Sequence, residues 1–235
     1  MSKKIRFDLE IIANLIEEKS KILDIGCGNG ELLHLLKTVK NVDGRGLEIN
    51  QNDVSKAVAK GISVIHGDAK RDLPHYPDDS FDYAILSQTI QAMENPKEIL
   101  EQMLRIAKFA IISLPNFAYF KNRFYLLLKG EMPVRKNIPY QWYDTPNIHF
   151  CSINDFEKLC KKMGFSIKEK FYINSKGKKA GLLHGKIFAN FLAEFGVFVI
   201  TKNDRNFVTE SEFVFKQSKN SILKNNEVGL ATQSK

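Results

Sequence analysis

The chain has 235 residues, more than one minimal domain needs and fewer than two full-sized domains usually take. Its composition, 43% hydrophobic and 26% charged, is that of a globular protein and excludes collagen, a coiled coil and wholesale disorder. The net charge of +8 permits contact with an acidic partner. The lysines are scattered, however, so the charge alone gives little support for nucleic-acid binding.

Nothing in the sequence predicts a membrane-spanning or exported chain. The longest apolar runs, such as 109–114 and 195–200, are far shorter than the roughly 18 to 20 residues that cross a bilayer. The basic N-terminal residues lead into a stretch that contains several acids rather than an apolar signal-peptide core. The three cysteines are too few and too widely spaced for a disulfide framework. We therefore expect a cytoplasmic protein without membrane contact.

The first half of the chain alternates between helical and strand patterns. A helix over 8–19 comes first, because Leu9, Ile12 and Ile16 lie on one face. A strand and a glycine-rich loop then lead into a helix with buried leucines, and further helices follow at 51–60 and 96–107. The predicted strands of this region are 21–25, 43–49, 63–66, 81–87 and 109–114. Strands separated by helices indicate a parallel sheet in an α/β fold.

The alternation stops after the fifth strand. Residues 116–150 contain one basic and aromatic helix, at about 118–129, and a long irregular segment, which is typical of functional loops. A helix over 154–163, with Ser152 or Asn154 as its cap, and strands at 165–173 and 197–201 complete the core. We expect residues 204–235 to be a mostly disordered polar tail.

The glycine-rich loop is the strongest local signal. Gly26, Gly28 and Gly30 follow a strand and open a helix, at the carboxyl edge where parallel sheets bind ligands. In a dinucleotide fingerprint the third glycine comes one residue later, and the loop here is preceded by Asp24. A carboxylate at this point repels a pyrophosphate and attracts a cation. S-adenosylmethionine meets that requirement, because it has no phosphate and presents an ammonium and a sulfonium.

Acidic residues also follow the next two strands. Glu48 lies 22 residues beyond Gly26, at a strand tip where an acid can accept both ribose hydroxyls, and Asp68 is placed to bind the adenine amino group. One cofactor explains acids at successive strand tips; the alternative is that they are helix caps and turn residues. The candidate cofactor-binding residues are Asp24, Gly26, Cys27, Gly28, Gly30, Glu48, Ile49, Asp68, Ala69, Ser87 and Gln88. We expect no metal site, because the five histidines never fall at ligand spacing.

Two resemblances refine this prediction. The strand ending in Asp24 and its G-x-G-x-G loop resemble motif I of class I S-adenosylmethionine-dependent methyltransferases. The strings at 81–92, 113–117, 130–134 and 139–149 resemble the MetW family of methionine biosynthesis proteins.

The resemblance to the MetW family runs from about residue 5 to 202. It implies an α/β, doubly wound, Rossmann-like sheet of seven strands over 1–203, mostly parallel with the last strand antiparallel, and a lid insertion at 116–150. It also implies that Asp24, Gly26, Gly28, Glu48 and Asp68 occupy the cofactor-binding places of the wider methyltransferase class. The implied partner is a homoserine O-acyltransferase, with this chain as an accessory subunit that is not itself assured of catalysis.

The 116–150 segment would cover the cofactor and form any pocket for a methyl acceptor. His149 is its candidate base, against a structural or interfacial hydrogen-bonding role. The same residue types are enriched in protein interfaces, so partner binding is an alternative. The apolar helix within it either packs on the sheet edge, which we favour, or meets a partner. The expected polar and aromatic lining is Tyr119, Tyr140, Trp142, Tyr143, Asp144, Asn147 and His149.

Three functions remain open at this point. The first is an accessory protein of methionine biosynthesis that binds S-adenosylmethionine, or S-adenosylhomocysteine, together with a homoserine O-acyltransferase. The second is a methyltransferase that acts on a small metabolite. A nucleic-acid methyltransferase ranks last, because 87–90 reads Ser-Gln-Thr-Ile rather than an Asn-Pro-Pro-Tyr pocket for a flipped base.

Overall fold

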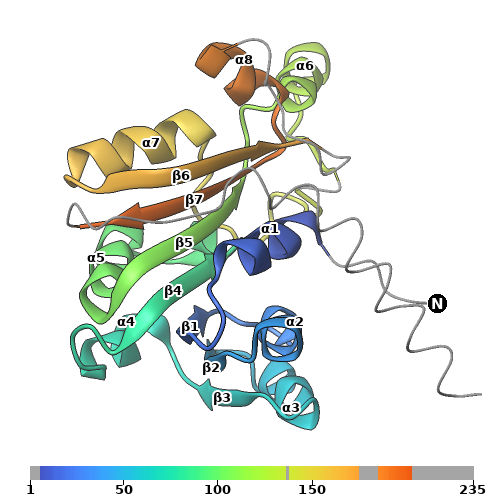
Figure 1. The fold of residues 1–235 in the computed structure, drawn as a ribbon. Coiled ribbons are helices and arrows are strands. Elements are labelled where there is room, and N and C mark those ends of the chain that lie inside the picture. The colour runs from blue at the N-terminus through green and yellow to red at the C-terminus, as the bar shows by residue number, and fades with distance from the viewer. Residues whose placement is uncertain (1–5, 136–137, 175–184, 203–235) are drawn as a thin grey trace, which may run out of the picture. The chain divides into compact units, whose positions relative to one another are not determined.

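Seven apolar strands form one sheet in the part of the chain described by the computed structural model, residues 6–135, 138–174 and 185–202 (Figure 1). The strands lie in the order β3-β2-β1-β4-β5-β7-β6. All pairs among β1 to β5 are parallel, whereas β7 is antiparallel to both β5 and β6. The predicted fold class is therefore confirmed. The strands are β1 (Lys21–Ile25), β2 (Asp43–Glu48), β3 (Ser63–His66), β4 (Phe81–Ser87), β5 (Ala107–Pro115), β6 (Ser166–Ile173) and β7 (Phe195–Thr201).

Helices cover both faces of the sheet. In Figure 1, α1, α2 and α3 lie on one side and α5 and α7 on the other, while α6 and α8 stand beyond the ends of β5 and β7. The helices are α1 (Phe7–Leu15), α2 (Glu31–Lys40), α3 (Gln51–Ala59), α4 (Ala69–Asp72), α5 (Pro96–Ile106), α6 (Phe120–Lys129), α7 (Ile153–Lys162) and α8 (Gly185–Leu192), with short 3₁₀ turns η1 (Leu73–His75) and η2 (Ile90–Ala92). Within the described ranges, no helix has the length and apolar character that crossing a membrane requires.

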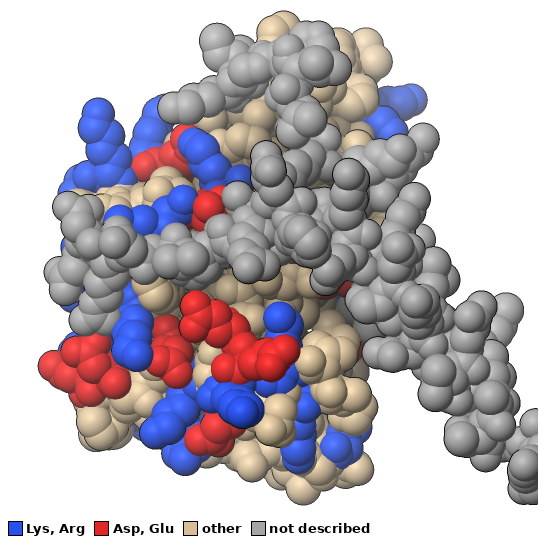
Figure 2. Space-filling model, in the orientation of Figure 1, with Lys and Arg blue, Asp and Glu red and all other residues tan. Residues whose placement is uncertain are grey.

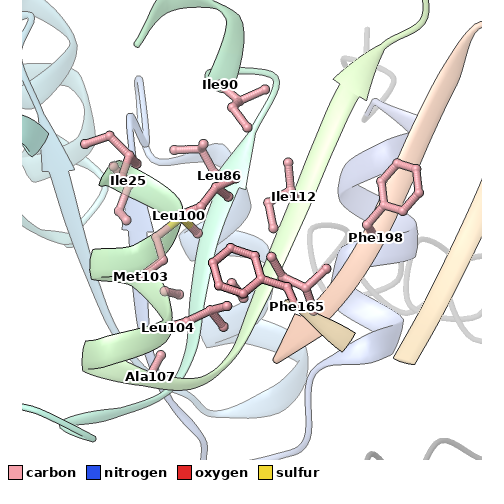
Figure 3. Packing of buried hydrophobic residues seen from close by; sticks show 14 of the residues in the cluster. Ile25, Leu86, Ile90, Leu100, Met103, Leu104, Ala107, Ile112, Phe165 and Phe198 are labelled. Carbon is pink, nitrogen blue, oxygen red and sulfur yellow. The ribbon is translucent and has the colours of Figure 1, made fainter. Parts of the chain in front are cut away.

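The main core fills the space between the sheet and the helices α5 and α7 (Figure 3). The α5 helix starts with Pro96, whose missing N–H costs nothing there, behind the cap Asn95. Its apolar face then presents Leu100 and Met103, both without solvent exposure, to the strands. Burying each such side chain contributes roughly 1.5–3 kcal/mol, so this layer fixes how the strand ends are arranged.

Most predicted elements agree with the structure to within two residues, but the first helix is shorter. The α1 helix ends at Leu15 instead of continuing to residue 19. Ser152 proves to be the cap of α7, through a capping box with Asp155. The helix α8 and the single turn α4 were not predicted. The predicted disorder of 204–235 concerns residues outside the described ranges.

The predicted packing of the apolar helix on the sheet edge is wrong. Asn122 is the one buried side chain among the described residues of α6, whereas Leu127 and Leu128 are 77% and 78% exposed. Buried Asn116, whose amide donates to two carbonyl oxygens of the α8 region, turns the chain away at the end of β5. The described part of α6 packs through Phe120 and Phe124 on the ring of Phe191.

Candidate functional site

The glycine-rich loop passes closely between the ends of neighbouring strands. The Gly26 amide donates to the Leu47 carbonyl at 2.7 Å, which ties the loop to the end of β2. Gly26 has a φ of +67°, and a Cβ there would lie 2.5 Å from Cγ2 of Thr89. Gly28 also has a positive φ, +53°, but a Cβ there would meet nothing within 4 Å. Backbone conformation thus favours glycine at both positions, and at Gly26 the lack of space for a Cβ favours it further.

A cavity of about 360 Å³ opens at this edge of the sheet. The strand order reverses between β1 and β4, and doubly wound sheets bind ligands in the crevice at such a switch point. The volume lies in the range of small-molecule sites. The ends of β1, β2, β3 and β4 all contribute. The lining residues are Gly26, Leu47, Glu48, Ile49, Gly67, Asp68, Ala69, Lys70, Thr89, Ala92, Met93, Glu94, Asn95 and Ile99.

Glu48 connects the tip of β2 to the glycine-rich loop. Its Oε2 accepts a hydrogen bond from the Gly28 amide, and its Oε1 accepts one from the Asn50 amide, both at 2.8 Å. The side chain is buried and lines the cavity. Each carboxylate oxygen can accept a further hydrogen bond. Glu48 can therefore still bind a pair of hydroxyl groups presented from the cavity.

Asp24 is a buried carboxylate with one oxygen that has no hydrogen-bond partner among the described residues. The residue is 2% exposed, and the unpartnered oxygen is Oδ1. Burial raises the pKa of Asp24 to about 7, with the Arg6 guanidinium opposing the rise and the Glu48 carboxylate adding to it. Asp24 does not line the cavity itself. An unpaired buried carboxylate is costly, and a cationic ligand at this sheet edge would reduce that cost.

Asp68 has two roles in the structure. Its Oδ1 accepts a hydrogen bond from the Lys70 amide at 2.9 Å, so it is the N-cap of α4, as the capping alternative states. The same residue lines the cavity beside Ala69. The cap holds the carboxylate at the cavity wall, where its second oxygen can accept a hydrogen bond.

Six of the eleven predicted cofactor-binding residues lie outside the cavity wall: Asp24 and Gly28, described above, and Cys27, Gly30, Ser87 and Gln88. Cys27 packs in a small apolar cluster that includes Leu33, and burial raises the pKa of its thiol, so the thiol stays protonated at neutral pH. Gly30 opens α2 with a left-handed conformation. Ser87 and Gln88 bond to the first helix, described next.

Sequence reasoning missed a polar network between α1 and the ends of β4 and β5. Asp8 is buried, and its Oδ2 accepts hydrogen bonds from Arg6, Ser87, Gln88 and Ser113 at 2.8–3.2 Å. The available signal was an acid on the apolar face of the first helix, next to Leu9. The network also holds Arg6, whose guanidinium opposes the rise in the pKa of the Asp24 carboxyl.

Sequence reasoning also missed the part of the wall that comes from the segment after β4. Lys70 and Glu94 form an ion pair at 2.7 Å between two wall segments, and Met93 and Ile99 supply apolar wall. Both charges are exposed, so the pair contributes little to stability. No pattern in the sequence shows that this segment folds back over the strand ends.

The predicted lid residues do not line the cavity. His149 is exposed, its amide donates to the Gln91 carbonyl at 2.9 Å, and its Nε2 lies 3.4 Å from the Glu94 carbonyl oxygen. Trp142 and Tyr143 are 71% and 66% exposed. None of the residues of 116–150 that the structure describes lines the cavity, although His149 bonds to the backbone of the wall residue Glu94. Among the residues that the structure covers, no three His, Cys, Asp or Glu side chains gather as a metal site.

Comparison with known proteins identifies the family. The model of the family described as methionine biosynthesis protein MetW matches residues 6–200. The chain belongs to the MetW family. A bifunctional methionine biosynthesis protein MetXA/MetW of Rhodopirellula baltica is 37% identical over 174 residues, which are 70% of this chain and 28% of that protein. The chain thus spans little more than a quarter of the length of that MetW relative.

Methyltransferases are more distant relatives of this MetW-family chain. A demethylmenaquinone methyltransferase of Listeria welshimeri is 25% identical over 172 residues, 64% of this chain and 72% of the enzyme. A Thermotoga maritima S-adenosylmethionine-dependent methyltransferase, a possible histamine N-methyltransferase, has the same fold, with a TM-score of 0.60 and 23% identity over 84% of this chain and 89% of the other. The MetW-family fold is therefore methyltransferase-like, but a shared fold does not decide the reaction.

Proposed function

We propose that this chain binds S-adenosylmethionine at the cavity beyond β1 to β4 and acts with a homoserine O-acyltransferase as an accessory, regulatory subunit of methionine biosynthesis. The observation that carries the binding part is the charge of the site. The cavity wall holds three carboxylates, Glu48, Asp68 and Glu94, against the single ammonium of Lys70, and the unpaired carboxylate of Asp24 lies close by. Such a site favours a cation over a phosphate-bearing dinucleotide.

The residues present fit the cofactor group by group. Glu48 would accept the ribose hydroxyls, Asp68 the adenine amino group, and Asp24 would face the positively charged amino-acid end. Gly26 lets the backbone border the cavity at a point where a Cβ would collide with Thr89. When bound, the cofactor supplies a methyl group on a sulfonium, which is a good leaving group. The chain's own contribution is to hold that group in place.

The accessory role rests on the family relationship rather than on the composition of the wall. The wall residues within the described ranges include no His, Tyr or Cys, and the groups there that could take a proton from a methyl acceptor are the carboxylates of Glu48, Asp68 and Glu94. His149, the candidate base, is exposed, does not line the cavity, and bonds to the backbone of Gln91 and Glu94. Its assignment as a base remains a proposal.

The partner is inferred from the Rhodopirellula relative. That protein combines MetXA and MetW in one chain, so the two activities occur there at a fixed ratio and at high local concentration. For this chain we infer a non-covalent complex with a separate acyltransferase. Binding of S-adenosylmethionine, a downstream product of the pathway, would then regulate the acyltransferase according to the concentration of that product.

Calorimetric titration in both orders tests the proposal. If S-adenosylmethionine changes the affinity for the acyltransferase of the same organism, the acyltransferase must change the affinity for the cofactor by the same factor. We expect a common factor of about 5 to 150. Binding of both ligands with unchanged affinities would remove the regulatory role and leave the complex. Absence of acyltransferase binding would remove the accessory function.

A small-metabolite methyltransferase is the second candidate, favoured by the similarity to demethylmenaquinone methyltransferases. Incubation with S-adenosylmethionine labelled in its methyl group and a metabolite extract tests it. Label in a product that is absent with the Asp24→Ala chain would establish methyl transfer. Unlabelled extracts, with cofactor binding intact, would count against it.

A further inference from the structure

The charged residues at the sheet edge follow the order of the strands. Asp68, Glu48 and Asp24 lie at the ends of β3, β2 and β1, which are neighbours in that order. The next strand is β4, and its last residue bonds to Arg6. We propose that Arg6 binds the carboxylate at the amino-acid end of S-adenosylmethionine. The inference rests on the proposed cofactor binding and assigns a residue to the one negatively charged group of that ligand.

Arg6 is held in one orientation at the end of β4. Its Nε and Nη2 donate to the two carboxylate oxygens of the buried Asp8, at 3.1 and 2.8 Å. Its Nη2 also donates to Oγ of Ser87, the last residue of β4, at 2.6 Å. Because these bonds already order the guanidinium, little conformational entropy is lost when a ligand binds to it.

The Arg6 guanidinium keeps capacity for a ligand. An arginine side chain has five N–H donors, and the two on Nη1 make no hydrogen bond with the residues that the structure describes. The side chain is 46% exposed, so a ligand can reach it. A guanidinium binds a carboxylate through charge-assisted hydrogen bonds, which are stronger than those between neutral groups.

Arg6 does not line the cavity, but its partner Ser87 adjoins the cavity wall. The Ser87 carbonyl accepts a hydrogen bond from Oγ1 of Thr89 at 3.0 Å. Thr89 and Gly26, which lie against each other, both line the cavity. The Arg6 guanidinium also opposes the rise in the pKa of Asp24, as a cation close to that carboxyl does. Arg6 therefore lies by the part of the wall that the ends of β1 and β4 form, where the proposed function places the amino-acid end.

Asp24 and Arg6 together suit a zwitterion. The amino-acid end of the cofactor carries an ammonium and a carboxylate on the same carbon atom. Asp24 has an oxygen without a partner among the described residues, and Arg6 has two unused donors there. On the face that Figure 2 shows, acidic and basic side chains are interspersed. Such a mixture attracts a carboxylate to no single point, so its recognition requires a local cation such as Arg6.

Calorimetric titration with two ligands tests the proposal. Decarboxylated S-adenosylmethionine keeps the nucleoside, the sulfonium and the amine and lacks only the carboxylate. The ratio of the two affinities measures how well a chain recognises that carboxylate. Arg6→Gln should lower the preference for S-adenosylmethionine over the analogue about tenfold relative to wild type, because charged hydrogen bonds to the carboxylate are lost.

The control is Arg45→Gln, which alters an exposed arginine of β2 outside the cavity wall and should keep the wild-type ratio. A purely structural role of Arg6 would weaken the binding of both ligands alike, so an unchanged ratio in Arg6→Gln overturns the assignment. Wild-type chain that binds neither ligand overturns the proposed cofactor binding itself.

A second measurement on the wild type does not depend on how well Arg6→Gln folds. Phenylglyoxal modifies accessible arginines, and peptide mass analysis reports the modification of Arg6. Saturating S-adenosylmethionine should slow this modification several-fold more than the saturating analogue does. Equal protection of Arg6 by the two ligands would overturn its contact with the carboxylate.

Discussion

At the scale of single residues, Asp8 connects the first helix to two strand ends, so its loss should reduce stability. We expect Asp8→Asn to lower the free energy of unfolding by about 1–3 kcal/mol, because Arg6 loses its anion and the hydroxyl donors meet an amide group. Urea unfolding measures the change. The control is Asp53→Asn, whose ion pair with Lys56 lies on the surface and should contribute less than about 0.5 kcal/mol. Equal losses in the two variants would contradict the network's importance.

The raised pKa of Asp24 predicts how the stability of the folded chain depends on pH. Its pKa is about 7 in the folded chain and 3.8 in its ordinary state, so between these values the folded chain holds a proton that the unfolded chain has lost. The free energy of unfolding should therefore fall as pH rises from about 4 to about 7, by on the order of 4 kcal/mol from this group.

Urea titrations at several pH values, with wild type and Asp24→Asn, isolate that contribution from other titrating groups. The difference in unfolding free energy between the two chains should change steadily between pH 4 and pH 7 and level off above it. A difference that is independent of pH would show that Asp24 titrates normally.

At the scale of elements, the loop between β1 and α2 contains two glycines that are favoured for different reasons. Both have a left-handed backbone conformation, and Gly26 alone also lacks space for a Cβ. Gly28→Ala should cost about 1–2 kcal/mol, because only the left-handed conformation is penalised. Gly26→Ala adds contact with Thr89 and should cost more. The thermal unfolding of both variants, each alone and each combined with Thr89→Ala, measures the difference. The second substitution should restore part of the loss in Gly26→Ala and none in Gly28→Ala; equal effects would contradict the steric explanation.

The elements also show what the sequence can predict. Strand patterns located β1, β3 and β4 to the residue, and strand-loop-helix alternation implied that Asp24, Glu48 and Asp68, at the ends of β1, β2 and β3, lie at one edge of the sheet. Glu48 and Asp68 line the cavity at that edge. The bond between Arg6 and Ser87 joins residues 81 positions apart, and the Lys70–Glu94 pair joins residues 24 apart. Such contacts depend on how loops fold back over the sheet, which local periodicity does not record.

At the scale of the whole molecule, apolar composition was a poor guide to burial. The helix α6 is apolar enough to predict packing on the sheet, yet its leucines face outward because β5 ends before it begins. An apolar composition indicates that a helix face favours contact with another surface, but it does not show whether that surface belongs to the same chain or to a partner. That depends on where the connections between strands place the helix. The family's proposed role in a complex agrees with that exposure.

The central claim is that the carboxyl edge of β1 to β4 binds a cationic nucleoside through its carboxylates. Calorimetric titration of S-adenosylmethionine at pH 7.5 into wild type, Glu48→Gln and the exposed control Glu101→Gln tests it most directly. We predict saturable 1:1 binding to wild type and control, and at least about tenfold weaker binding to Glu48→Gln with its melting temperature checked. Folded wild type that binds no S-adenosylmethionine, or a Glu48→Gln chain that binds it as tightly, would contradict the account.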